Sequence, residues 1–178
     1  MRKLFVLASL IVFLSYSIRA AEHSGAEICF PGTNDYISPI RGIRVVWNEP
    51  VESTTSHILS FFLRDDPKAL FVVEFVRHIC LLWSPTEQYV AMTDASWSDM
   101  STVWVYTLDT LDSGINLREK LPASLQIQVE QNHHAYLVAE SWQETQLRVR
   151  VWGYGDLNPQ GFEASMLCGK VEEEWDCW

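Results

Sequence analysis

The sequence predicts an all-β protein, a single domain of antiparallel meanders with at most one or two short helices. Three observations support this fold class. Residues 21–178 are rich in Val, Ile, Trp, Tyr, Phe and Thr, their apolar side chains tend to alternate with polar ones, and Pro, Gly and polar stretches separate the alternating runs. No low-complexity linker or sharp change in composition divides this part of the chain, so we expect one domain.

The expected strands follow this alternation along the chain. Turn-forming stretches such as Asn48-Glu49-Pro50 and Ser84-Pro85 separate them. The strands cover residues 42–47, 57–63, 70–82, 89–93, 102–108, 124–130, 135–140, 147–152 and 162–168.

Residues 112–120 are the one segment expected to be helical. Asp112 or Ser113 is placed to cap its first turn, Ile115 and Leu117 supply apolar positions, and Pro122 ends it. One short helix of this kind keeps the fold class all-β.

The first twenty residues have the pattern of a secretory signal. Arg2 and Lys3 give a positive start, an apolar stretch follows, and Ala20 is a small residue suited to cleavage. The alternative, a membrane anchor, is less well supported because the stretch is shorter than the roughly 20 apolar residues that span a bilayer. We therefore expect a signal peptide over residues 1–20 and a domain over 21–178, with no membrane insertion after cleavage.

The part of the chain that follows this signal is strongly acidic. Removal of Arg2, Lys3 and Arg19 leaves 10 basic residues against 23 acidic ones, a net charge of −13. Such a surface repels phosphate backbones and anionic lipid head groups, so nucleic acid and membrane surfaces are poor partners. A basic protein is a better match, and a charge that serves only solubility is the alternative.

All four cysteines, Cys29, Cys80, Cys168 and Cys177, lie after the signal. An even number in an exported chain predicts two disulfides, and with the signal it predicts a periplasmic or secreted location. Three pairings are possible and the sequence does not choose among them. Cys168 with Cys177 is the most economical, and Cys29 would then pair with Cys80. There is no Cys-x-x-Cys and no close Cys/His cluster, so we expect no metal site.

The stretch LLWSPTEQYVAMTD (residues 81–94) has the features of a hairpin. Pro85 fixes φ at the first central position of a turn, Ser84 can hydrogen-bond the turn backbone, and Trp83 carries a large ring to bury.

In this stretch and in VWVYTLDT (residues 103–110) the chain resembles the blades of TolB-type and WD40-type β-propellers, in which a Trp-Ser-Pro-Asp-Gly turn joins two strands. The resemblance covers about residues 70–110, and its motif occurs once, with Thr86-Glu87 in place of Asp-Gly. It implies propeller-blade-like or sandwich-like sheets, and it implies no particular chemistry because blade motifs serve many functions.

The loop TDASWSDMST (residues 93–102) is the first candidate binding site. Asp94 and Asp99 flank Trp97, and an exposed Trp beside acidic groups is suited to partner recognition. Two carboxylates on one loop also suggest a hard cation such as calcium, but the Asp-x-Asp-x-Asp-Gly spacing is missing. A solvated hairpin loop is the structural alternative.

The C-terminal tail VEEEWDCW (residues 171–178) is the second candidate. Glu173, Trp175 and Trp178 would form an acidic-aromatic arm that clamps a basic partner. The structural alternative is a terminus pinned by Cys177, with its Trp rings packed on the sheet.

Motifs that specify an enzyme are absent from the sequence, and no cofactor is expected. Adjacent His133 and His134 would point to opposite faces of a strand and so would not share a metal. Gly-x-Gly in residues 153–161 is followed by Asn158-Pro159, which indicates a loop and opposes phosphate binding.

We therefore expect a small exported β-rich protein that recognises a protein partner through acidic-aromatic loops. The alternative is an envelope hydrolase that uses loop carboxylates such as Asp94 or Asp99.

Overall fold

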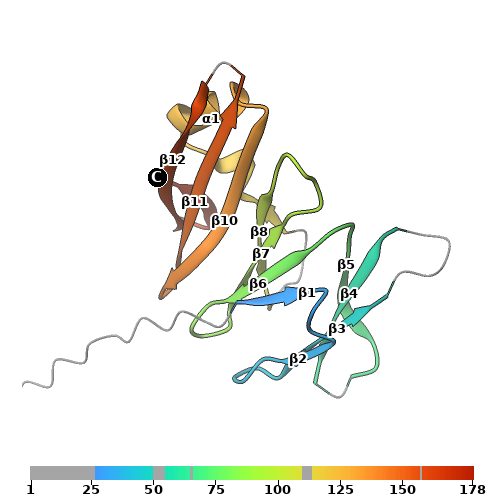
Figure 1. Ribbon diagram of the computed structural model, residues 1–178. Helices are drawn as coiled ribbons and strands as arrows, with labels where there is room; N and C mark the ends of the chain where they lie inside the picture. Colours follow the sequence, from blue (N-terminus) through green and yellow to red (C-terminus); the bar gives the residue numbers. More distant parts are fainter. Residues whose placement is uncertain (1–26, 50–54, 65, 110–113, 157) are drawn as a thin grey trace, which may run out of the picture.

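The computed structural model describes residues 27–49, 55–64, 66–109, 114–156 and 158–178, and over these ranges it confirms the all-β single domain. The expected signal peptide lies outside the described residues. The strands form three antiparallel sheets, and in Figure 1 the longer strands of the central sheet are green and those of the third sheet are orange to dark red. The first sheet has the order β2 (Asp35–Ile37), β3 (Ile43–Asn48), β4 (His57–Leu63) and β5 (Ala69–Phe75). The central sheet has the order β1 (Ile28–Phe30), β6 (Ile79–Trp83), β7 (Tyr89–Asp94), β8 (Thr102–Thr107) and β9 (Ile115–Asn116). The third has the order β10 (His134–Gln143), β11 (Gln146–Gly155), β12 (Asn158–Val171) and β13 (Glu174–Cys177). A 3-10 turn, η1 (Leu117–Lys120), and one helix, α1 (Ala123–Glu130), connect β9 to β10.

The central sheet is buried on both faces. In β7, Tyr89 and Ala91 belong to the apolar core shared with the third sheet, whereas Val90 and Met92 belong to the core shared with the first sheet. Successive residues of a strand point to opposite faces, so a strand covered on both sides needs apolar residues at consecutive positions. This explains the uninterrupted apolar runs on either side of the Ser84-Pro85 turn.

The structure corrects one expected strand, because residues 124–130 lie in α1. Leu125, Ile127 and Val129 alternate as in a strand, but Leu125 and Val129 are four residues apart and share one face of a helix. Both are buried there, whereas Ile127 is 54% exposed. The carbonyl of Pro122 accepts the first hydrogen bonds of the helix, so the proline starts this element.

The helix expected over residues 112–120 is realised only at its end, as η1. Its cap is Asn116, whose side chain accepts the Arg118 N–H, while Asp112 and Ser113 lie outside the described residues. Over the described ranges, no helix is long and apolar enough to cross a membrane.

Three further differences concern strand boundaries. Residues 153–155 and 158–161, expected to lie in a loop, belong to the ends of β11 and β12. The strand expected over residues 70–82 is divided into β5 and β6, because residues 76–78 lead the chain from the first sheet into the central one. Four short strands, β1, β2, β9 and β13, were not expected. Each has two to four residues, too few for alternation to be recognised.

The WSPTEQY stretch forms the hairpin turn between β6 and β7, as the sequence indicates. The Ser84 N–H donates to the Tyr89 carbonyl at 2.9 Å, and Ser84 Oγ accepts the Tyr89 N–H at 3.0 Å. Glu87 closes the turn with a left-handed backbone, φ 51°, a conformation that glycine adopts most readily.

The side chain of Glu87 connects this turn to the first sheet. It is only 2% exposed, and its carboxylate accepts the backbone N–H groups of Ile40 and Arg41 at 3.1 and 2.6 Å. Both donors lie in the β2–β3 connection. The carboxylate therefore joins two sheets, a function that glycine cannot supply.

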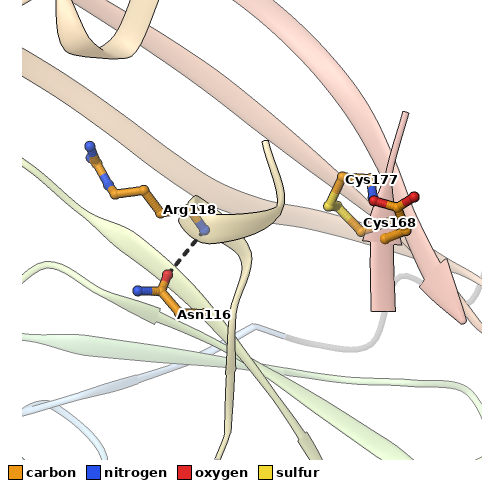
Figure 2. The surroundings of a disulfide bond; sticks show 5 residues. Asn116, Arg118, Cys168 and Cys177 are labelled. Atoms are coloured by element: carbon orange, nitrogen blue, oxygen red, sulfur yellow. Dashed lines mark hydrogen bonds between the residues drawn. A yellow bond between two sulfur atoms is a disulfide. The ribbon is translucent and has the colours of Figure 1, made fainter. Parts of the chain in front are cut away.

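Two disulfides are present, Cys29–Cys80 and Cys168–Cys177. This is the most economical of the three possible pairings. Each joins directly paired residues of neighbouring antiparallel strands. The second one holds β13, and with it the C-terminus, onto β12 (Figure 2). Two disulfides fit an extracellular or otherwise oxidising compartment.

Candidate binding surface

The loop between β7 and β8 presents Trp97, which is 68% exposed. We call residues 95–101 the tryptophan loop. Its first half is fixed to the β5–β6 connection, because the Ala95 N–H donates to the His78 carbonyl at 3.1 Å and Ser96 Oγ accepts the Val76 N–H at 3.2 Å. A large exposed ring is thus carried on an anchored backbone.

The second half of the loop is fixed to β10. The Ala135 N–H donates to the Asp99 carbonyl at 3.1 Å. The hydroxyl of Ser101 donates to the Leu137 carbonyl at 2.8 Å and accepts the Leu137 N–H at 3.1 Å. The Tyr136 hydroxyl donates to the Ser98 carbonyl at 3.0 Å. The loop therefore has backbone contacts on both sides of Trp97.

Arg118 supports the end of the loop from η1. Its Nη2 donates to the carbonyls of Ser101 and Ala135, at 3.3 and 2.7 Å. Burial lowers the pKa of Arg118, although a guanidinium remains charged.

Figure 2 shows the cap of η1, where Asn116 Oδ1 accepts the Arg118 N–H at 3.0 Å. Asn116 Oδ1 also accepts the Thr102 hydroxyl at 2.8 Å, so η1 is tied to β8.

Asp94 lies at the base of the loop and has local hydrogen-bond partners. Its Oδ1 accepts both the N–H and the hydroxyl of Ser96, at 2.9 and 2.5 Å. Burial raises the pKa of Tyr106 to about 12, and the Asp94 charge adds to this. Because its hydrogen bonds go to Ser96, Asp94 shapes the loop, whereas the side chain of Asp99 is exposed.

The two candidate sites predicted from the sequence lie apart. The tryptophan loop contacts β10 near Ala135, whereas Glu173 lies in the β12–β13 turn. His134 pairs with Tyr154 at one end of the third sheet, and the β12–β13 turn extends beyond Cys168 at the other. The residues of the loop and of the tail therefore do not form one surface.

The tail itself is a strand and not a free arm. Trp175 is 2% exposed and packs edge-on against Tyr89 and Trp142, with ring centroids at 5.3 and 6.2 Å. A buried ring cannot contact a partner, so Trp175 is corrected from a candidate binding residue to a core residue. Glu173 and Trp178 are exposed, Trp178 by 51%.

A set of rings, of which only His134 was considered from the sequence, lies beside the tryptophan loop on the outer face of the third sheet. We call His134, Tyr136, Trp152 and Tyr154 the aromatic face. Tyr136 stacks on Trp152 with centroids 4.2 Å apart, and His134 stacks on Tyr154 at 4.5 Å. The pKa of Tyr136 is raised, first by loss of hydration and then by the neighbouring Tyr154.

The carboxylates proposed for a hydrolase, Asp94 and Asp99, line neither of the two hollows that the described residues form on the third sheet. Among the described residues, the group nearest to a metal-site arrangement is Glu27 with Cys29 and Cys80, whose sulfurs are joined to each other.

Comparisons with known protein families, with curated proteins and with solved structures find no match. The candidate surface is therefore interpreted from its own geometry.

Proposed function

We propose that this chain is an exported binding protein that recognises a protein partner through the tryptophan loop, with Trp97 as the anchor residue. The observation that carries the proposal is the 68% exposure of Trp97 on a loop held from both sides. Trp is prominent among residues that dominate binding energy, and a fixed loop loses little conformational entropy when a partner binds.

The charge of the molecule supports a basic surface on the partner. The full chain carries a net charge of −10, and the exposed carboxylate of Asp99 lies two residues from Trp97. Complementary charge accelerates encounter and makes association sensitive to salt. The signal pattern and the two disulfides support a periplasmic or secreted location, where this partner would be met.

The experiment compares three forms of the mature, oxidised protein: wild type, Trp97→Ala and Trp178→Ala. Trp178 is the exposed Trp of the tail, the other candidate site, so its variant distinguishes the tryptophan loop from the tail. Each form is immobilised and exposed to an extract of the native compartment at low and high salt, and a captured protein is then purified and titrated.

We expect wild type and Trp178→Ala to bind the same protein, and Trp97→Ala to bind it at least about thirtyfold more weakly, the ratio for a hot spot of about 2 kcal/mol. Thermal unfolding should be unchanged in both variants, since both rings are exposed. A partner that binds Trp97→Ala as tightly as wild type would refute the assignment.

A further inference from the structure

Two hollows lie next to each other on the outer face of the third sheet, and Tyr154 lines both. The first, of about 540 Å³, is also lined by His133, His134 and Asp156. The second, of about 490 Å³, is also lined by Arg150, Trp152, Gln160 and Glu163. Pro159 lines both as well, so the hollows form one shallow tract divided by Tyr154 and Pro159.

The register of the third sheet produces this tract. His134 pairs with Tyr154 and Tyr136 with Trp152, so four rings share the outer face. Tyr154, which separates the hollows, is 42% exposed. An apolar ring surface that water reaches can bind the C–H face of a flat ligand.

The β11–β12 hairpin forms the floor of the second hollow. Gly161 has φ 71°, and a Cβ at this position would lie 2.5 Å from the Gly153 carbonyl oxygen. A Cβ at Gly153 would in turn lie 2.4 Å from the His134 carbonyl oxygen. Both glycines are therefore required by close backbone packing in this hairpin.

The polar side chains around these rings include both hydrogen-bond donors and hydrogen-bond acceptors. Glu163 and Asp156 offer carboxylate acceptors, Gln160 offers an amide, and Arg150 offers guanidinium donors. Arg150 forms ion pairs with two carboxylates: its Nε lies 3.7 Å from Glu140 and its Nη1 lies 3.6 Å from Glu163. Donors and acceptors set between ring surfaces match a ligand with many hydroxyls and an apolar ring face.

Other ligand classes fit this tract less well. A quaternary ammonium group favours an aromatic cage, but here it would meet the cation of Arg150. Stacked nucleobases would bring phosphates toward a chain of net charge −10. An acidic sugar would face Asp156 and Glu163.

We propose that this tract binds a neutral oligosaccharide, with Tyr154 stacking on a sugar ring and Glu163, Gln160, Arg150 and Asp156 hydrogen-bonding its hydroxyls. The tract borders the tryptophan loop, because Tyr136 stacks on Trp152 and donates to the Ser98 carbonyl, but this proposal does not depend on the protein-binding function proposed for the loop.

The test titrates the mature, oxidised protein with maltohexaose, cellohexaose and chitohexaose, and with a hexamer of galacturonic acid, by isothermal calorimetry. We expect at least one neutral hexamer to bind with a Kd below about 1 mM, which corresponds to about 4 kcal/mol. Tyr154→Ala should weaken that binding at least about tenfold, the ratio given by about 1.4 kcal/mol. Tyr154→Phe, which keeps the ring, should stay within about threefold of wild type.

Two further variants keep the outcome decisive. Glu163→Gln changes a side chain that is 68% exposed, so the fold should be retained while binding weakens severalfold. Trp97→Ala should leave sugar binding unchanged, which separates this site from the protein-binding one. The proposal is overturned if no neutral hexamer binds, if only the acidic hexamer binds, or if Tyr154→Ala binds like wild type.

Discussion

Glu87 allows a quantitative test of how the first and central sheets are joined. Its carboxylate accepts two backbone N–H groups of the β2–β3 connection, and its backbone has a positive φ of 51°. Hydrogen bonds to a charged group contribute roughly 1.5–3 kcal/mol each, and partial hydration of the freed donors reduces the loss. We therefore expect Glu87→Ala to lower the free energy of unfolding by roughly 2–4 kcal/mol.

Glu87→Gly separates the carboxylate from the backbone. Glycine loses the same hydrogen bonds but adopts the left-handed conformation without the cost of about 1 kcal/mol that a side chain carries there. The glycine variant should therefore be about 1 kcal/mol more stable than the alanine variant and still clearly less stable than wild type.

Glu144 supplies the matched control. It also has a positive φ, 55°, in the β10–β11 turn, but its side chain is exposed. Glu144→Ala should leave the free energy of unfolding nearly unchanged. Glu144→Gly should be more stable than Glu144→Ala by about 1 kcal/mol, because only the backbone cost differs between them.

Thermal unfolding of the oxidised protein measures these differences, because about 1 kcal/mol shifts Tm by roughly 2–4 °C in a chain of this size. Glu87→Ala should melt roughly 5–15 °C below wild type. If it melts within about a degree of wild type, the carboxylate does not join the sheets. If Glu87→Gly is no more stable than Glu87→Ala, the backbone argument fails.

Two other predictions concern the disulfides and alkaline pH. Replacing Cys29 and Cys80 by Ala should lower the free energy of unfolding by about 4 kcal/mol, and replacing Cys168 and Cys177 should lower it by about 2.6 kcal/mol. The first loss is larger because that disulfide joins residues 51 apart in the sequence, whereas the second joins residues 9 apart. Urea unfolding measures both, and equal losses would contradict the loop-entropy reasoning. The pKa of Tyr106 is raised from 10.0 to about 12, so the folded protein keeps this proton to a higher pH than the unfolded chain does. This contribution to stability is complete below pH 10 and is lost as the pH rises toward 12, so Tyr106→Phe should show a shallower alkaline decline, and parallel curves would refute it.

The fold class could be predicted from the sequence because the burial of a strand on one face requires alternating apolar residues, and burial on both faces requires consecutive ones. The misassigned segment shows the limit of this signal. Leu125, Ile127 and Val129 satisfy a period of two, but they equally place Leu125 and Val129 on one helical face. Burial of this pair in the core shared with the third sheet stabilises the helix, and that contact involves residues far away in the sequence.

The tail contained a signal that would have placed its rings correctly. Cys177 must face Cys168, and in a strand Trp175 lies on the same face as Cys177, two residues away. Inward-facing Cys177 therefore implies inward-facing Trp175, and it directs Trp178 outward. The exposure of Trp97 followed from its loop, but its anchoring did not, since the contacts come from His78 and Ala135, distant in the chain.

The aromatic face depends on one residue that no turn rule would predict. Counted outward from the Gln143–Gln146 turn, regular pairing would place Tyr136 opposite Gly153. A bulge between Ala139 and Ser141 leaves Glu140 unpaired and shifts the register by one, so Tyr136 lies opposite Trp152 instead. Because directly paired residues share a face, this single extra residue places the rings of β10 and β11 together on the outer surface. The hollows beside Tyr154 are therefore a product of the bulge, and residue types alone did not reveal them.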